Sequence, residues 1–521
     1  MKKNKPTILA ILDGWGIGKK DDTNAIWLAK TPVFDALAEK YPFTQLGATG
    51  KDVGLDDRQT SGSETGHMNI GAGRIAIQDS RKISESINTG TFFHNAAFLG
   101  AISHVKKNKS NLHLAGLLGN ENSPHMNPYH LEALLLFAKK NNIKNVYIHF
   151  FTDGRDSYPK SALEHLADWE KRMKQIGVGK VASLVGRFWA MDRAKNWNRL
   201  KIAYDLLVSG KGKKFSKSSD AVKYSYQKNL TDEYIKPSLI CQSRDEALPR
   251  LYAEKTVTIN NNDSVIFFNL RSDRARQFSK LFVLEKSKET RLPSPRLKNL
   301  YFVAMTNFGP DLPVHTAFQD HPINGTLPAA LAKFSQLYIA ETEKFAHITY
   351  FLNGGYADAL DGEDRLMIPS PITDNYAKIP QMSAEKITQR VLGFLKKGRY
   401  DFTAINFANA DMVGHTGEMK ATIKAIEFVD KCLGKLWNNI QKHDGNLIIT
   451  ADHGNADCMW DTKANLPMTF HTKNPVPFII ASEKYKKKKL SRGGVLGNIS
   501  PTICDIIGTD KLKEMSKKSL L

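Results

Sequence analysis

The stretch TILAILDGWG, residues 7–16, begins with an unbroken apolar run and ends in an aspartate, a tryptophan and two glycines. A continuous apolar run followed by turn residues is typical of a strand buried on both faces of a parallel sheet. Comparable apolar runs recur at residues 112–118, 145–151, 265–270, 301–305, 347–352, 402–408, 446–451 and 476–481. Amphipathic segments such as 129–142 and 419–443 separate several of these runs. The alternation predicts an α/β protein with mostly parallel sheets.

Length and composition indicate a soluble protein of at least two domains. The chain has 521 residues, of which 41% are hydrophobic and 24% charged. It contains no apolar stretch of the roughly 20 residues that a membrane helix needs. The lysines before residues 8–12 mimic a signal peptide, but the apolar run is too short and breaks at Asp13. The four scattered cysteines form no C-x-x-C pair, which favours free thiols in a reducing cytoplasm; they are Cys241, Cys432, Cys458 and Cys504.

The formal net charge is +21, from 74 basic and 53 acidic residues. Such an excess is compatible with nucleic acid, an anionic membrane surface or small anionic substrates as partners. The richest lysine segments, 209–228 and 482–492, have the composition of solvated loops. Because no nucleic-acid module accompanies them, we expect no nucleic-acid partner. A basic nucleic-acid-binding protein is the alternative from another functional class, although it would leave the acidic and histidine motifs unexplained.

Aspartate and histidine recur where several of the expected strands end. In open α/β sheets, ligands bind at the carboxyl ends of strands, so these side chains could converge. Carboxylates and imidazoles suit Mn²⁺ or Zn²⁺, and the set is large enough for a two-metal site acting on a phosphoryl group. Asp-Gly alone is common turn chemistry, and D-x-x-x-H alone is a weak signal, so the prediction depends on the segments taken together. The candidate residues are Asp13, Asp411, His415, Asp452, His453 and His471.

The segment TSGSETGHMN, residues 60–69, places Ser63 among small and flexible residues. Ser63 is therefore either a turn residue or a nucleophile. A bound metal lowers the pKa of a coordinated hydroxyl, so Ser63 could act as an alkoxide nucleophile without a neighbouring base.

The middle of the chain carries a different chemistry, with arginines following expected strands. Arginine is the fork-shaped partner of carboxylate and phosphate, so the set predicts a pocket for a small anion. Asp156, beside Arg155, is a candidate general acid/base, with a structural salt bridge as the alternative. The arginines are Arg155, Arg187, Arg193, Arg271 and Arg274.

Two segments have the composition of hinges, namely residues 78–84 and the proline-bearing stretch 309–322. If both are hinges, the middle of the chain is a domain inserted into another, and the two ends of the chain fold together.

Nine motifs in colinear order carry a resemblance that covers essentially the whole chain. They read ILDGWG, GSETGHMNIGAGR, FTDGRD, GRFWAMDR, FFNLRSDRARQ, AETEKFAH, NFANADMVGHTG, TADHGNAD and HTKNPVPF. The combination resembles the cofactor-independent (2,3-bisphosphoglycerate-independent) phosphoglycerate mutases of the alkaline phosphatase superfamily.

The resemblance implies a two-domain α/β protein, with an alkaline phosphatase-like metal-binding domain at residues 1–80 and 318–521. An inserted α/β substrate-binding domain would span residues 84–315. The first domain would carry two Mn²⁺ ions, one held by Asp13, Ser63, Asp452 and His453, the other by Asp411, His415 and His471. Lys344 would neutralise charge on the phosphoryl group and contact the substrate. The glycerate would lie among His125, Arg155, Asp156, Arg187, Arg193, Arg271 and Arg274.

The activity that the resemblance implies is the interconversion of 3-phosphoglycerate and 2-phosphoglycerate in glycolysis and gluconeogenesis. The phosphate would pass to Ser63 and return to the other hydroxyl while Asp156 shuttles the proton. The family also suggests a monomer, which we expect to lie in the cytoplasm. A phosphate-monoester hydrolase of the same superfamily is the alternative; it would share the metal residues and lack the arginine set. A phosphopentomutase-like enzyme is disfavoured by FTDGRD and GRFWAMDR.

The chain departs from the family pattern at two places. Gly62 stands where the family usually has asparagine before the serine. The stretch HMNPYH, residues 125–130, replaces H-S-H-I-N-H, retaining His125 and His130. We expect His67 to support the serine loop rather than to bind metal.

Overall fold

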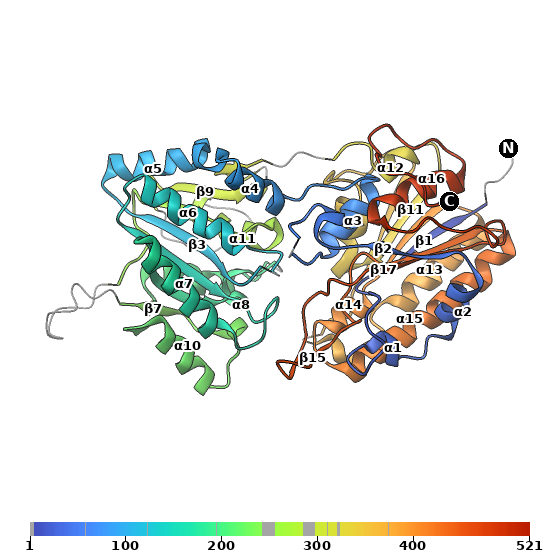
Figure 1. Ribbon diagram of the computed structural model, residues 1–521, viewed down its shortest axis with the longest axis horizontal. Helices are drawn as coiled ribbons and strands as arrows, with labels where there is room; N and C mark the ends of the chain where they lie inside the picture. The colour runs from blue at the N-terminus through green and yellow to red at the C-terminus, as the bar shows by residue number, and fades with distance from the viewer. Residues whose placement is uncertain are drawn as a thin grey trace. The chain divides into compact units, whose positions relative to one another are not determined.

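The chain folds into two compact units (Figure 1). Unit 1 comprises Met1–Gln78 and His321–Leu521, and unit 2 comprises Asp79–Asp320. The computed structural model describes residues 5–57, 59–121, 123–193, 195–241, 256–284, 297–309, 311–319, 323–373 and 375–521. Unit 1 is therefore built from both ends of the sequence.

Unit 1 is organised around an eight-stranded sheet with the order β12-β11-β13-β1-β14-β17-β2-β18. The strands from β12 to β14 run parallel, and β17 is antiparallel to both of its neighbours. Every residue of β1, β11, β13, β14 and β17 is buried, which explains why these strands are apolar on both faces. The strands are β1 (Thr7–Leu12), β2 (Phe43–Gly47), β11 (Gln336–Glu341), β12 (Glu363–Ile368), β13 (Phe402–Phe407), β14 (Asn446–Thr450), β17 (Val476–Ala481) and β18 (Gly494–Val495).

Helices cover both faces of this sheet (Figure 1). One group contains α1 (Ala25–Leu28), α2 (Pro32–Lys40), α13 (Ala384–Lys397) and α15 (Met419–Ile440). The other contains α3 (Ser63–Ala72), α12 (Leu327–Ala330) and α16 (Ile499–Ile507). Parallel strands with helices on both faces form the α/β architecture that the sequence predicted, and this prediction is confirmed.

Unit 2 contains a second eight-stranded sheet, with the order β10-β9-β8-β3-β4-β5-β7-β6. All of its neighbouring strands are parallel except β5 and β7. The strands are β3 (Leu112–Leu118), β4 (Val146–Thr152), β5 (Lys180–Gly186), β6 (Lys213–Phe215), β7 (Ser238–Ile240), β8 (Ser264–Phe267), β9 (Tyr301–Thr306) and β10 (His315–Phe318). The helices packed around it include α4 (Asp79–Asn88), α5 (Ala96–Asn108), α6 (Pro128–Lys140), α7 (Ala162–Ile176), α9 (Trp197–Ser209), α10 (Ser218–Gln227) and α11 (Ser272–Val283).

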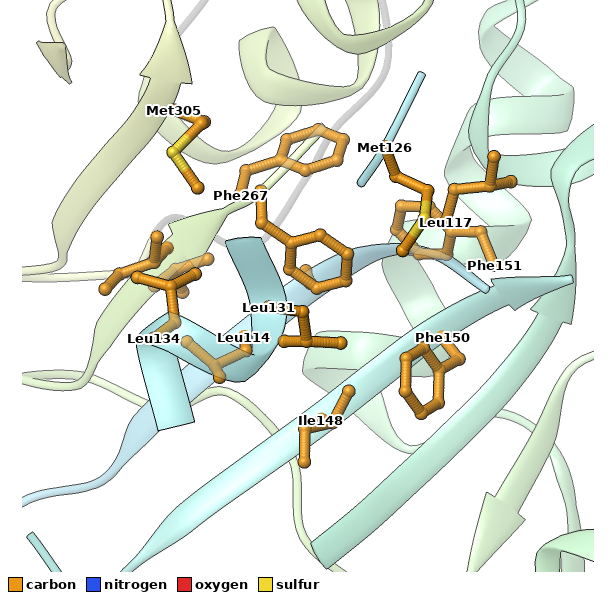
Figure 2. Packing of buried hydrophobic residues seen from close by; sticks show 14 of the residues in the cluster. Leu114, Leu117, Met126, Leu131, Leu134, Ile148, Phe150, Phe151, Phe267 and Met305 are labelled. Carbon is orange, nitrogen blue, oxygen red and sulfur yellow. The ribbon is translucent and has the colours of Figure 1, made fainter. Parts of the chain in front are cut away.

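The core of unit 2 is a continuous cluster of aliphatic and aromatic side chains. Figure 2 shows part of it, with Leu131 and Leu134 of α6 close to Leu114 of β3 and Ile148 of β4. Phe267 of β8 belongs to the same buried cluster. This packing holds the strands rigidly, so the loops at their ends have a fixed frame.

Residues 347–352 do not form the strand that their apolar character suggested. Residues His347–Phe351 form a π-helical turn, η5, in which the Leu352 amide donates to the His347 carbonyl at 3.1 Å. Ile348 and Leu352, four residues apart, are fully buried while Tyr350 is 38% exposed, which is a helical pattern of burial. The strand of this region is β11, which precedes the turn.

The expected hinge at residues 78–84 is largely helical, because α4 begins at Asp79 and buries Ile83 and Ile87 on one face. In the other expected hinge, residues 310 and 320–322 lie outside the described residues. Among the helices that the structure describes, none combines the length and the apolarity required to cross a membrane.

Candidate active site

The carboxyl edge of the unit 1 sheet gathers aspartates and histidines from three adjacent strands. Asp13 directly follows β1, Asp452 and His453 follow β14, and Asp411 lies in α14 (Asn409–Gly414) just after β13. Because β13, β1 and β14 are parallel neighbours, their carboxyl ends meet at this edge. Backbone hydrogen bonds fix the arrangement, as the Asp13 amide donates to the Phe407 carbonyl and the Asp411 amide to the Asp13 carbonyl.

The first group in this edge consists of Asp411, His415 and His471. The Nδ1 atom of His415 is 2.5 Å from the Thr469 carbonyl, and that of His471 is 2.7 Å from the Ser61 carbonyl. A carbonyl only accepts, so each Nδ1 carries a proton, and a lone pair on Nε2, where the ring has one, faces inward.

Three acceptors thus face one another in this group. The two Nε2 atoms are 3.1 Å apart, and each is 3.2 Å from Asp411 Oδ1. Burial, and then the positive charge of His453, lower the pKa of His471 to about 4, which keeps its ring neutral. Ligand atoms about 2.1 Å from one ion lie roughly 3.0–3.5 Å from each other, so this donor set fits a metal ion. Without a cation the three lone-pair donors would repel.

The second group consists of Asp13, Ser63, Asp452 and His453. The Ser63 hydroxyl lies 3.2 Å from Asp13 Oδ1 and 3.1 Å from His453 Nε2. His453 Nε2 is also 3.4 Å from Asp13 Oδ1 and 3.5 Å from Asp452 Oδ2. The buried Asp452 Oδ2 lies 3.2 Å from His67 Nδ1, but that N–H is also directed at the Ser63 carbonyl at 2.9 Å. A buried carboxylate oxygen that only shares a donor is costly unless a cation satisfies it, so this group also fits a metal ion.

Lys344 brings the positive charge that balances these carboxylates. It ends the 3₁₀ turn η4 (Thr342–Lys344) after β11, and its Nζ lies 2.7 Å from Asp13, 2.6 Å from Asp411 and 2.6 Å from the Ser63 hydroxyl. Burial lowers the pKa of Lys344, but Asp13 and Asp411 outweigh burial and raise it above its usual value. Burial likewise opposes ionisation of Asp411, yet Lys344 holds the pKa of Asp411 well below its usual range.

Ser63 is the first residue of α3, so its hydroxyl lies at the positive end of a ten-residue helix. The preceding Gly62 has φ −157° and ψ 178°, an extended conformation that any residue adopts. The glycine that replaces asparagine here is therefore not required by the backbone. Gly66, by contrast, is required, since a Cβ at this position would overlap the backbone of Asp452.

The second cluster of site residues lies in unit 2 and is centred on Arg187. This buried guanidinium donates to Asp153 at 2.5 Å and to Asp156 at 2.6 Å. His125 Nε2 is 3.8 Å from Asp156. Although burial raises the pKa of Asp156, Arg187 holds it well below its usual range. Burial and the nearby Arg187 lower the pKa of His125 well below its usual value, so this ring is neutral.

Three further arginines act on Asp273 through their charges, namely Arg271, Arg193 and Arg274. Arg193 lies 3.3 Å from Asp273, and Arg274 donates to the Met191 carbonyl at 3.0 Å. The pKa of Asp273 is lowered despite its burial, because Arg271, Arg193 and Arg274 stabilise its charged form. Burial and the charges of Arg193, Arg155 and Arg187 lower the pKa of Arg274 well below its usual value.

The candidate residues therefore form two clusters, one in unit 1 and one in unit 2. The sequence alone gave no role to Asp153 or Asp273, although each stands within an arginine motif, FTDGRD and RSDRAR respectively. Their signal was charge balance, since buried arginines need carboxylate partners.

Comparisons with known proteins bear on what this arrangement does. Residues 5–511 match the Metalloenzyme superfamily. The 2,3-bisphosphoglycerate-independent phosphoglycerate mutase of Clostridium botulinum is 44% identical, and that of Clostridium kluyveri 45% identical, each with 99% of both chains covered. The solved structure of Leishmania mexicana phosphoglycerate mutase at low cobalt concentration superposes with a TM-score of 0.88 at 28% identity, covering 99% of this chain and 97% of that one.

These matches confirm the resemblance found in the sequence, and with it the expectation of an enzyme from a metal-binding superfamily. The chain belongs to the Metalloenzyme superfamily and, within it, to the 2,3-bisphosphoglycerate-independent phosphoglycerate mutases.

Proposed function

We propose that this protein interconverts 3-phosphoglycerate and 2-phosphoglycerate through a phosphoserine on Ser63, without 2,3-bisphosphoglycerate. The observation that carries the proposal is the environment of the Ser63 hydroxyl, which lies within hydrogen-bonding distance of Asp13, His453 and Lys344. A serine so placed is a nucleophile in a site built for developing negative charge.

Two Mn²⁺ ions complete the site in this proposal. One would be held by Asp13, Ser63, Asp452 and His453, and the other by Asp411, His415 and His471. The support is the donor set, in which carboxylate oxygens and inward-facing Nε2 lone pairs converge at 3.1–3.5 Å. When bound, such ions act as Lewis acids on the phosphoryl oxygens and lower the pKa of the serine hydroxyl.

The phosphoryl transfer itself is carried by residues of unit 1. Ser63 Oγ attacks phosphorus, so that the bond to Oγ forms while the bond to the substrate oxygen breaks. The proton that Ser63 gives up is balanced by the proton that the leaving substrate oxygen takes up to become a hydroxyl. Lys344 stays protonated, since its pKa is raised, and offsets the charge that develops on the phosphoryl oxygens. The return step reverses these events towards the other hydroxyl of glycerate.

Unit 2 would retain the glycerate while the phosphate resides on Ser63. The carboxylate of the glycerate would be bound by five arginines, with His125 beside it. These are Arg155, Arg187, Arg193, Arg271 and Arg274. Asp156, held ionised by Arg187, would accept the proton of one glycerate hydroxyl and deliver it to the other. The pairing of Arg187 with both Asp153 and Asp156 supports this role, because it keeps the carboxylate oriented before substrate arrives.

In domain terms, residues 1–80 and 318–521 would form the dimetal domain and residues 84–315 the inserted substrate-binding domain. We further propose a cytoplasmic monomer acting on small molecules in glycolysis and gluconeogenesis.

The test is an enolase-coupled assay with 3-phosphoglycerate and no added 2,3-bisphosphoglycerate, comparing Mn²⁺ with EDTA while free phosphate is measured. We expect Mn²⁺-dependent formation of 2-phosphoglycerate with little phosphate release, and its loss in Ser63→Ala. Ser225→Ala, which removes a buried hydroxyl bonded to the Ala221 carbonyl in α10, is the matched control. Phosphate release without 2-phosphoglycerate would indicate a phosphate-monoester hydrolase, and activity that survives Ser63→Ala would end the phosphoserine mechanism.

A further inference from the structure

Two buried polar residues contact members of the Ser63 site and have no part in the chemistry described above. His67 is in α3, one turn after Ser63, and Asn406 is in β13; both are completely buried. Buried polar side chains persist when their hydrogen bonds are satisfied, so their partners indicate what they do.

His67 and Asn406 contact each other and three residues of the Ser63 site. His67 Nδ1 lies 2.9 Å from the Ser63 carbonyl and 3.2 Å from Asp452 Oδ2. Asn406 Nδ2 donates to Asp13 Oδ2 at 2.7 Å and lies 3.0 Å from His67 Nε2. The pair thus spans the carboxyl ends of β1 and β14 and the first turn of α3.

The direction of each hydrogen bond follows from the partners. Asp13 only accepts, so the Asn406 amide nitrogen must face it; the reverse orientation would set an oxygen against a carboxylate. The second proton of the same amide then points to His67 Nε2, which must accept. His67 therefore carries its proton on Nδ1 and donates it towards the Ser63 carbonyl and Asp452.

A competing role for His67 is that of a metal ligand. Asp13, His67 and Asp452 each offer a ligand atom within 4.8 Å of the others and are all buried. Yet a ligating imidazole needs a free lone pair, and in this arrangement the Nδ1 position is a donor while the Nε2 lone pair accepts from Asn406. Both nitrogens are engaged with protein groups.

We propose that His67 and Asn406 are positioning residues that fix Asp13, Asp452 and the Ser63 backbone as one preformed metal-binding edge. The inference rests on the metal ions of the proposed function and adds to it the groups that orient their ligands. Partners of this kind typically contribute 10–100-fold to metal affinity. In the group of Asp411, His415 and His471, the two imidazoles are held by the Thr469 and Ser61 carbonyls rather than by His67 or Asn406, so the ion of that group should be unaffected.

The test is Mn²⁺ binding to metal-stripped protein, followed by electron paramagnetic resonance and by metal counting, for His67→Leu, Asn406→Leu and the double variant. We expect two ions per chain in the parent protein, and a loss of roughly 10–100-fold in affinity at one site only in each single variant. The double variant should lose less than the sum of the singles, because the two residues act through one another. His67→Asn, which can place an N–H near the Nδ1 position, should recover part of the affinity.

Asn446→Leu is the matched control, since Asn446 is a buried asparagine at the opposite end of β14, bonded to Thr7 and Ser482. It should lower stability without changing either Mn²⁺ affinity.

Three ions in the parent protein and two in His67→Leu would overturn the inference by making His67 a ligand. So would equal weakening of both sites, additive effects in the double variant, or unchanged affinity in folded His67→Leu and Asn406→Leu. Because the readout needs no substrate, absence of mutase activity in the parent protein would refute the proposed function and leave this result standing.

Discussion

Replacing Lys344 by methionine should distinguish two contributions of this lysine. It stabilises the protein when no metal is bound, and it assists catalysis when metal is bound. Lys344 is 4% exposed, and its Nζ contacts both Asp13 and Asp411 within 2.7 Å. Methionine has a similar length and no charge, so the substitution removes the cation while leaving most of the volume filled.

The magnitude follows from the local charges. Without metal, Asp13, Asp411 and Asp452 contribute three formal negative charges. Lys344 and His453, whose pKa is raised to about 9 by Asp452 in spite of burial, contribute two positive ones. The sum is −1, and Lys344→Met makes it −2 in a buried volume. Removing one partner of a buried ion pair costs about 3–5 kcal/mol, so the metal-free variant should lose about that much free energy of unfolding.

The same substitution should strengthen Mn²⁺ binding, although it weakens the metal-free protein. Lys344 repels a divalent cation, and one pair of unit charges about 4 Å apart at an effective dielectric of about 20 is worth roughly 4 kcal/mol. If a third of that is realised, Mn²⁺ binding to Lys344→Met becomes roughly tenfold tighter. Turnover should nevertheless fall by about 10²–10³, the usual loss when one stabilising group is removed from a developing charge.

The assays are urea unfolding in EDTA and in saturating Mn²⁺, Mn²⁺ titration, and the enolase-coupled rate. Lys280→Met is the matched control because Lys280 is also a buried lysine, 7% exposed, in α11 of unit 2. Its stability loss should be the same in EDTA and in Mn²⁺.

Charge balance by Lys344 is refuted if Lys344→Met lowers the free energy of unfolding equally with and without Mn²⁺, or if Mn²⁺ binds more weakly to the variant. Either result would mean that Lys344 supports the ligands mechanically rather than balancing their charge.

Burial lowers the pKa of His130 to about 3 from an ordinary 6.5, so the folded state resists a proton that the unfolded state binds. The stability that His130 contributes above pH 6.5 is then lost towards pH 3, at about 1.4 kcal/mol per pH unit. In His130→Gln, the urea midpoint should therefore fall less steeply as the pH is lowered. An unchanged slope of midpoint against pH would contradict this expectation. Arg187→Met leaves Asp153 and Asp156 without their buried partner, so urea unfolding should show a loss of about 3–5 kcal/mol in the free energy of unfolding. The KM for 3-phosphoglycerate should also rise. A stable variant with an unchanged KM would exclude the role assigned to Arg187. Asp457 accepts from Thr472 at 2.7 Å, next to His471, so Asp457→Ala should weaken Mn²⁺ binding at the Asp411 group by about 10–100-fold in a titration, and weakening only at the Ser63 group would refute this.

The order of elements was readable from the sequence wherever burial and composition agree. Continuous apolar runs such as residues 446–451 are strands because both sheet faces are covered, and the amphipathic segment 419–443 contains the long helix α15. The run at 347–352 misled because apolar content does not distinguish a short buried helix from a strand. The strand β11 lacked the length of apolar sequence that marked the others, since QLYIAE begins and ends with polar residues.

The candidate metal ligands were readable for a related reason. Aspartate and histidine are rare at buried strand ends, so Asp452-His453 after an apolar run stands out. Their relative geometry was not readable, because it depends on which strands become neighbours. The pairing of β1 with both β13 and β14 is a long-range result of sheet order, and it alone brings Asp13 between Asp411 and Asp452.

Asn406 shows that some of the missing information was nevertheless present. It interrupts FTAINFA, an apolar strand in which an unpaired amide would cost several times the energy of an ordinary surface substitution. A polar residue in such a position predicts a buried partner that needs a hydrogen bond, and the only open question is which one. The structure answers it with Asp13 at 2.7 Å. An isolated polar residue within a fully buried strand therefore points to the groups that support a site, just as polar residues after the strand point to the site itself.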